Sequence, residues 1–200
     1  VATYARTLTR ALHHAGYYVD MVYGLDIPNS SNPAIREVRF FDGLELPPVK
    51  RPKLFSKQWI HDRKLDLYPP STQEVVLTGR VESRQLADRL PAFDRILNVD
   101  GIFRRAARHF RRTGKMTTIH IDNPPDIMHW TYPLPIKVFG IKNIYTIHDL
   151  VPLKLPYTTL DNKEFYSKLI DVISNKSDAI CTVSQSSYRD ILEFFPLAKN

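Results

Sequence analysis

His148 and Asp149 are the titratable pair whose place in the sequence most suggests chemistry. They end a strand-like run, Asn143 to His148, and Pro152 then prevents further sheet pairing. Ligands of open α/β sheets bind beyond the carboxyl ends of the strands, where a histidine can hydrogen-bond a ligand or move a proton. Because side chains alternate between the faces of a strand, we expect His148 to donate to the ligand and Asp149 to support the loop backbone or cap a turn. The alternative is a purely structural histidine.

A second candidate region begins with the β-like run from Asp126 to Trp130, which leads into an aromatic, proline-rich loop. His129 lies near the end of this run. The rings of Trp130 and Tyr132 can stack on a sugar or a base, although such residues also commonly anchor loops in a core. We expect His120, in a separate β-like run, to be structural.

Small hydroxylated residues connect a strand at Ala179–Val183 to a helix at Ser186–Phe195. Ser184 or Ser186 is suited to be the N-cap of this helix, because a serine oxygen accepts a hydrogen bond from a free amide at a helix start. Capping accounts for most of the serines. A phosphate site at the same helix start is the functional alternative.

A basic helix is expected from Gly101 to Arg112, capped by Asp100, with its apolar side formed by Phe103, Ala106, Ala107 and Phe110. Arg104, Arg108 and Arg111 share one face at i, i+4 and i+7 spacing. This pattern fits a solvated face, or a surface that docks on acidic lipids. Nucleic-acid binding has less support, because no recognition module surrounds the helix.

The elements that would position these residues alternate between helical and strand-like patterns. Two further helices are expected at Thr3–Ala15 and Asn162–Ser174, and three further strands at Tyr17–Tyr23, Glu74–Gly79 and Thr117–Ile121. A proline-rich and basic stretch, about residues 25–72, reads as a surface excursion with one short strand at Arg36–Phe41 and one short helix near Phe55–His61. The alternation predicts an α/β fold: a single domain built on a Rossmann-like open parallel sheet with helices on both faces.

The bulk composition fits a folded domain with anionic partners. Of the 200 residues, 43% are hydrophobic and 24% are charged, so disorder is not expected for most of the chain, and the formal net charge of +7 favours anionic partners. Cys181 is the only cysteine, which fits a small core residue in a cytoplasmic protein. Neither a membrane-spanning run nor a signal peptide is visible in the sequence.

Several common site motifs are absent from the sequence. There is no Walker loop, no Gly-x-Gly-x-x-Gly, no zinc-type spacing of cysteine and histidine, and no Gly-x-Ser-x-Gly. These absences argue against the common phosphotransferases, dinucleotide oxidoreductases, metal sites and α/β-hydrolases.

Three segments of the chain resemble the amino-terminal domain of family 4 glycosyltransferases, which have the GT-B fold. The first helix, from Thr3 to Leu12, resembles the helix that follows the family's glycine-rich loop. His129 with Tyr132-Pro133 resembles its "His, then Tyr-Pro-x-Pro" stretch. The pair Thr146-Ile-His-Asp-Leu-Val-Pro152 and Thr182-Val-Ser-Gln-Ser-Ser187 resembles the family's "Thr-Ile-His-Asp-Leu-x-Pro" and "Thr-Val-Ser-x-x-Ser" motifs.

The resemblance implies transfer of a sugar from a nucleotide-sugar to a glycan or lipid-linked acceptor, with retention of configuration. It implies no cofactor beyond the nucleotide-sugar co-substrate and no metal. His148 would be the catalytic residue beside the transferred sugar and the β-phosphate, where it would hydrogen-bond a sugar hydroxyl or stabilise developing charge. His129 and Tyr132 would line the acceptor side. The remaining substrate-binding candidates are Thr3, Tyr4, Asp149 and Ser184.

The resemblance also implies parts of the enzyme beyond this sequence. We expect the family's first strand and glycine loop before Val1, and the donor-binding domain after Asn200, so the chain alone should be nearly inactive. The whole enzyme would act in polysaccharide, lipopolysaccharide or glycolipid assembly, in the cytoplasm and peripherally on an acidic inner membrane face. No specific nucleic acid is expected as a partner. The rival is a non-catalytic nucleotide- or anion-binding Rossmann-like module with a basic surface that faces membrane or nucleic acid.

Overall fold

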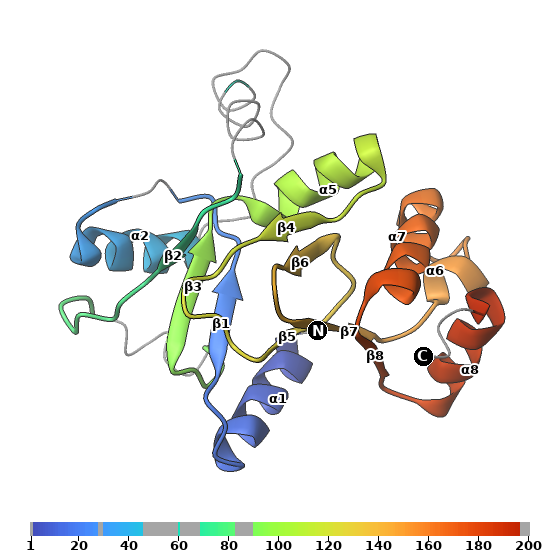
Figure 1. Ribbon diagram of the computed structural model, residues 1–200, viewed down its shortest axis with the longest axis horizontal. Coiled ribbons are helices and arrows are strands. Elements are labelled where there is room, and N and C mark those ends of the chain that lie inside the picture. The colour runs from blue at the N-terminus through green and yellow to red at the C-terminus, as the bar shows by residue number, and fades with distance from the viewer. Residues whose placement is uncertain (1, 28–29, 46–59, 61–68, 83–89, 197–200) are drawn as a thin grey trace. The chain divides into compact units, whose positions relative to one another are not determined.

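A computed structural model describes residues 2–27, 30–45, 60, 69–82 and 90–196, and these residues form short sheets and helices (Figure 1). The described elements form an α/β fold compatible with a Rossmann-like open sheet, so the predicted fold class is confirmed. The chain divides into two units, residues 2–105 and 106–200, which are described separately below. Within the described residues, we find no helix with the length and apolar character that a membrane crossing requires.

The unit of residues 2–105 contains a three-stranded sheet in the order β1-β3-β2. Among the described residues of this unit, the elements are α1 (Ala2–His14), β1 (Asp20–Tyr23), α2 (Pro33–Glu45), β2 (Thr72–Glu74) and β3 (Arg95–Val99). β1 runs parallel to β3, and β2 is an antiparallel edge strand. The expected helix at Thr3–Ala15 is therefore confirmed. The expected strand at Tyr17–Tyr23 is shorter than predicted, because Tyr17 and Tyr18 are exposed before β1 begins.

The expected strand at Arg36–Phe41 is wrong, because these residues lie inside helix α2. Asn32 starts this helix: its Oδ1 accepts hydrogen bonds from the amides of Ala34 and Ile35, at 3.0 and 3.4 Å. Pro33 supplies the fixed φ angle suited to a first helical position. The aromatic residues of this segment favour a strand by propensity, which is why a strand was predicted. The Asn-Pro signal for a helix start was present in the sequence but was not used.

Helix α2 is held by a hydrophobic core, so the stretch from about 25 to 72 is not all surface excursion. Phe40 is fully buried and packs with Phe41, Val75 and Ile96. The helix expected near Phe55–His61 lies outside the described residues, apart from Ile60. The strand expected at Glu74–Gly79 is wrong for most of its length, because β2 spans Thr72–Glu74.

The unit of residues 106–200 contains two parallel sheets. β4 (Thr117–Ile119) pairs with β6 (Ile136–Val138), and β5 (Ile127–Trp130), β7 (Lys142–Ile147) and β8 (Ala179–Thr182) form a sheet in the order β5-β7-β8. Its helices are α6 (Val151–Lys154), α7 (Lys163–Lys176) and α8 (Gln185–Phe194). The strands expected near β4, β5, β7 and β8 are confirmed, whereas β3 and β6 were not predicted.

Helices α7 and α8 pack on the β7-β8 sheet through one apolar cluster, formed by Ile147, Leu150, Ile170, Ile191 and Phe195. Both helices begin at polar caps. The Asn162 side chain accepts from the Phe165 amide at 2.7 Å, and Ser184 Oγ accepts from the Ser187 amide at 3.1 Å. Ser184 is therefore the N-cap of α8, as one of the two sequence alternatives expected.

Helix α5 (Ile102–Thr113) spans the boundary between the units and carries the basic residues noted above. Gly101 accepts a main-chain hydrogen bond at the start of the helix, from the amide of Arg105 at 3.0 Å, and capping by Asp100 stays a prediction. Gly101 has a φ of 56°, a left-handed conformation that glycine adopts without strain. Ala106 and Phe110 are buried, as their spacing predicted.

Candidate functional site

Strands β5, β7 and β8 are parallel, so they all end at one edge of their sheet. We call this edge, with the residues that follow Trp130, Ile147 and Thr182, the carboxyl edge. Three of the segments singled out in the sequence meet there: the loop after His129, the His148-Asp149 pair and the serine run before α8. This is the position at which open α/β sheets bind ligands.

His129 and Thr146 project from the same face of the β5-β7-β8 sheet. The register pairs His129 with Ile144, and side chains at 144 and 146 share a face because strand side chains alternate. His129 Nε2 lies 2.7 Å from Oγ1 of the fully buried Thr146. Burial lowers the pKa of His129 below its ordinary value, so the neutral ring is favoured.

The ring of the half-buried His148 is fixed by the loop that follows β5. Its Nε2 lies 2.9 Å from the main-chain oxygen of Thr131. A carbonyl oxygen only accepts, so Nε2 carries a proton and donates. In a neutral ring Nδ1 is then the acceptor nitrogen, and in a protonated ring Nδ1 also donates. The expectation that His148 donates to a ligand therefore applies to the protonated ring, through Nδ1.

The main chain of His148 is held by helix α8. Ser187, which is only 6% exposed, donates its Oγ hydrogen to the His148 carbonyl oxygen at 2.7 Å. Ser184 Oγ in turn donates to Ser187 Oγ at 3.0 Å, while Thr182 Oγ1 donates to the Ser184 carbonyl at 3.3 Å. The serine run and the His148 loop, far apart in sequence, thus form one hydrogen-bonded network. The sequence did not single out Ser187 as part of the His148 site.

Asp149 supports the turn into α6. Its Oδ1 accepts from the Val151 amide at 3.0 Å, and its carbonyl oxygen accepts from the Tyr166 hydroxyl at 2.8 Å. Burial, assisted by the charges of Asp149 and Asp161, raises the pKa of Tyr166 to about 12, so this hydroxyl remains a donor near neutral pH. These contacts match the loop-supporting role expected from the sequence, while substrate binding by Asp149 stays a prediction.

Trp130 and Tyr132 differ in what surrounds them. Trp130 is 4% exposed, its ring stacks on Tyr145 with centroids 6.3 Å apart, and its Nε1 donates to Asn143 Oδ1 at 3.2 Å. It is therefore part of the core rather than a stacking platform for a ligand. Tyr132 is half-buried in the loop at the carboxyl edge, and burial raises the pKa of its hydroxyl.

Asn143 is a buried structural residue that sequence reasoning missed. Besides the bond from Trp130, its Oδ1 accepts from the Val138 amide at 2.8 Å, and its Nδ2 donates to the carbonyls of Val138 and Ile141, both at 2.9 Å. The signal for it was available: an amide side chain at the start of an otherwise apolar strand needs buried partners. Asn143 holds β6 beside β7 and so supports the strand that carries His148.

Thr3 and Tyr4 lie on α1, in the unit of residues 2–105. Thr3 is exposed and Tyr4 is half-buried. Their contribution to a substrate site stays a prediction, as does that of the exposed Ser184, whose hydroxyl is used by the cap of α8.

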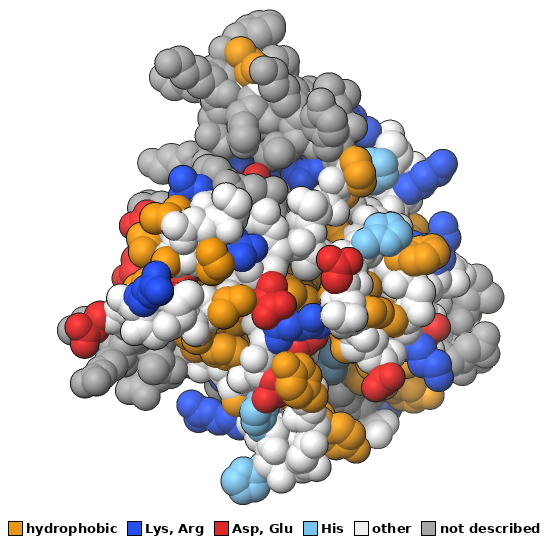
Figure 2. Space-filling view, turned by 60° about the vertical axis from the view of Figure 1, so that its left-hand side comes forward, with side chains coloured by type: hydrophobic (Ala, Val, Ile, Leu, Met, Phe, Trp, Pro, Cys, Tyr) orange, Lys and Arg blue, Asp and Glu red, His pale blue; other side chains and the backbone are white. Residues whose placement is uncertain are grey.

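The arginines of α5 are largely occupied within their own units. Arg104 forms an ion pair with Asp26, and Arg105 is 8% exposed and donates to the Asp100 carbonyl at 3.4 Å. The Arg111 guanidinium lies 4.8 Å from the centroid of the Phe165 ring. On the face drawn in Figure 2, Lys and Arg side chains are dispersed among acidic and hydrophobic ones.

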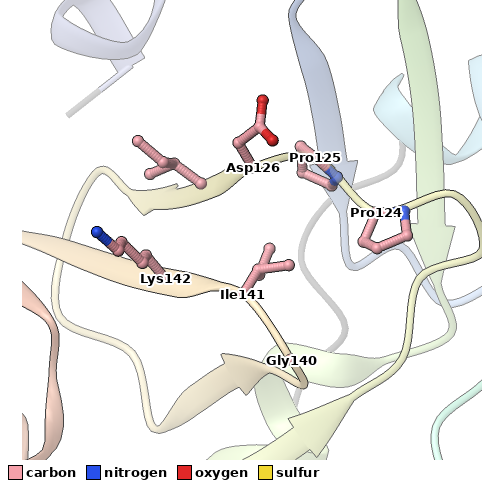
Figure 3. Close-up of a pocket in the computed structure, with 7 residues that line it drawn as sticks. Pro124, Pro125, Asp126, Gly140, Ile141 and Lys142 are labelled. Atoms are coloured by element: carbon pink, nitrogen blue, oxygen red, sulfur yellow. The ribbon is translucent and has the colours of Figure 1, made fainter.

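An open pocket of about 640 Å³ lies at the opposite end of strands β5 and β7 (Figure 3). Pro124, Pro125 and Asp126 lie along one side of it, and Ile141 and Lys142 along the other. Because these residues precede or begin the strands, the pocket is away from the carboxyl edge. Nor does the described part of the chain contain a group of three or more His, Cys, Asp or Glu side chains that could hold a metal ion.

Comparison of the chain with protein-family models, with curated proteins and with solved structures gives no match. The function is therefore inferred from the carboxyl edge itself.

Proposed function

We propose that the chain is the acceptor-side domain of a retaining glycosyltransferase. It would transfer a sugar from a nucleotide-sugar to a glycan or lipid-linked acceptor, with the donor held mainly by a second domain. The proposal includes action in the cytoplasm, peripherally at an acidic membrane face, and chemistry without a metal.

The observation that carries the proposal is the placement of His148 at the end of the central strand β7, with its ring oriented by Thr131 and its main chain held by Ser187. Preorganised groups aimed at developing charge are the largest single contribution in many enzymes. The partners of its ring and its carbonyl give His148 a fixed orientation at the strand end.

The proposed chemistry assigns different tasks to the two ring nitrogens of His148. Nε2 donates to the Thr131 carbonyl and keeps the ring in one orientation. Nδ1 faces the transferred sugar, where it accepts a hydrogen bond from a hydroxyl when the ring is neutral and donates to developing negative charge when the ring is protonated. The loop containing Tyr132 lines the acceptor side of the same edge.

A donor screen on the full-length protein, with UDP- and GDP-sugars and product identification, tests the activity. His148→Ala should lower transfer by about 10²-fold, the effect expected for one preorganised donor at a reacting centre. His120→Ala is a matched control, because His120 is an exposed histidine with its ring against Phe139. Unimpaired transfer by His148→Ala would remove the catalytic role.

The rival, a non-catalytic anion-binding module, depends on a basic surface available to a polyanion. The ion pair of Arg104, the burial of Arg105 and the ring contact of Arg111 reduce what α5 can offer to such a partner. Glycosyl transfer is therefore the better-supported function.

A further inference from the structure

We propose that Ser187 is a positioning residue that fixes His148 through its main chain. Its effect on turnover rests on the proposed glycosyl transfer, whereas its effect on the His148 ring does not.

The carbonyl of His148 lies one residue past the end of β7, and β8 ends at Thr182. The Ser187 hydroxyl, in the first turn of α8, binds this carbonyl at 2.7 Å. Because Ser187 is only 6% exposed, water has little access to take its place. Without the hydroxyl, the carbonyl next to the site would lose its partner from α8.

The hydroxyl of Ser187 is oriented for this task by its own helix. Ser184 caps α8 by accepting from the Ser187 amide, and it also donates to Ser187 Oγ. A side chain at the third helical position commonly reaches back to the cap residue to complete a capping box. Here the side chain at that position reaches instead to the loop of His148, so capping alone does not explain why its hydroxyl points there.

The ring and the main chain of His148 are thus anchored by two segments that follow different strands. Thr131, after β5, fixes the ring, and Ser187, after β8, fixes the main chain. A ring held at one end only can swing about its main chain, and small misplacements of a reacting group lower rates strongly. The pair of anchors sets both the position and the direction of Nδ1.

Kinetics of the full-length protein test the effect on turnover. Ser187→Ala should lower kcat by about tenfold with little change in KM, because the lost interaction orients a group rather than binding substrate. Ser187→Thr keeps the hydroxyl and should recover most of the rate. Ser186→Ala, an exposed serine in the same turn, is the matched control and should leave kcat unchanged. If Ser187→Ala does not fold, Ser187→Cys, which keeps the volume with a poorer donor, should show a smaller kcat loss of the same kind.

The state of the His148 ring gives a readout that does not require turnover. In protein labelled with ¹⁵N-histidine, the wild-type His148 signals should report a protonated Nε2, and Ser187→Ala should shift or broaden them while Ser186→Ala leaves them unchanged. Unchanged His148 signals and unchanged kcat in both Ser187→Ala and Ser187→Cys would overturn the positioning role. If no donor supports turnover, the proposed function fails, and the ring signals alone decide whether Ser187 positions His148.

Discussion

His129 and His148 have hydrogen-bond partners of different kinds, at residues 146 and 131. His129 contacts the hydroxyl of Thr146, a group that both donates and accepts, so its Nε2 can be satisfied in either tautomer. His148 contacts a main-chain carbonyl, which permits only donation from Nε2. The second arrangement fixes which ring nitrogen carries the proton, and it is the one found at the carboxyl edge.

Burial of His129 predicts a loss of stability in acid. Its folded-state pKa is lowered, so the unfolded chain, with an ordinary value of about 6.5, takes up the proton first. The contribution of neutral His129 is therefore complete above that value and declines as the pH falls below it.

Urea unfolding at about pH 7.5 and about pH 5.5 measures this contribution. His129→Gln, which cannot titrate but can still hydrogen-bond Thr146, should show a smaller decline between the two values than the wild type. His14→Gln, at an exposed histidine of α1, should decline as the wild type does. An equal decline in all three proteins would contradict the role assigned to the buried His129.

At the scale of elements, helix α2 is joined to the segment after β2 by a buried carboxylate. Glu37 is 1% exposed, and its Oε2 accepts from the Thr78 amide at 3.0 Å and from the Thr78 hydroxyl at 2.5 Å. The Phe40 and Phe41 core lies on the same helix and contacts Val75. Helix α2 therefore joins its neighbours through an apolar cluster and one charged hydrogen-bonded clamp.

Weakening this clamp should destabilise the chain. Glu37→Gln keeps the shape of the side chain but replaces a charged acceptor with a neutral one, and it should cost about 1–2 kcal/mol of unfolding free energy. Asp42→Asn, at an exposed position of the same helix, should stay within about 0.5 kcal/mol of the wild type. Denaturant midpoints of the two variants measure the difference, and equal midpoints would show that the Thr78 contacts add little.

At the scale of the whole molecule, the surplus of basic residues gives a net charge of +7. Such a charge favours anionic surfaces in general without choosing among them. The kind of partner therefore has to be identified by comparing candidate ligands and the salt dependence of their binding. The α5 arginines that are engaged within the protein limit how much of this charge can concentrate on one ligand.

Vesicle flotation and oligonucleotide binding together test the membrane proposal. We expect the full-length protein to float weakly with acidic vesicles at low salt and to lose this binding as salt rises, because exposed charges are screened. Neutral vesicles are the control. Oligonucleotide binding should be weak by comparison, and tight, steeply salt-dependent oligonucleotide binding would favour the non-catalytic rival.

Several elements could be predicted from the sequence because their signals are local. The apolar run of β7, the helical spacing of α7 and the serine cap of α8 each depend on residues within a few positions of one another, so pattern and propensity suffice. The position of His148 at a strand end followed from the same pattern. The fold class followed from the alternation of such elements.

Contacts between distant segments depend on the folded unit. Arg36–Phe41 follows a local Asn-Pro helix start, but its packing against Val75 and Ile96 comes from the fold. Trp130 is a core residue because Tyr145 and Asn143 contact its ring. Thr131 and Ser187 reach His148 across 17 and 39 residues. No local pattern encodes such pairings, because they depend on which strands lie side by side and therefore on the packing of the whole unit.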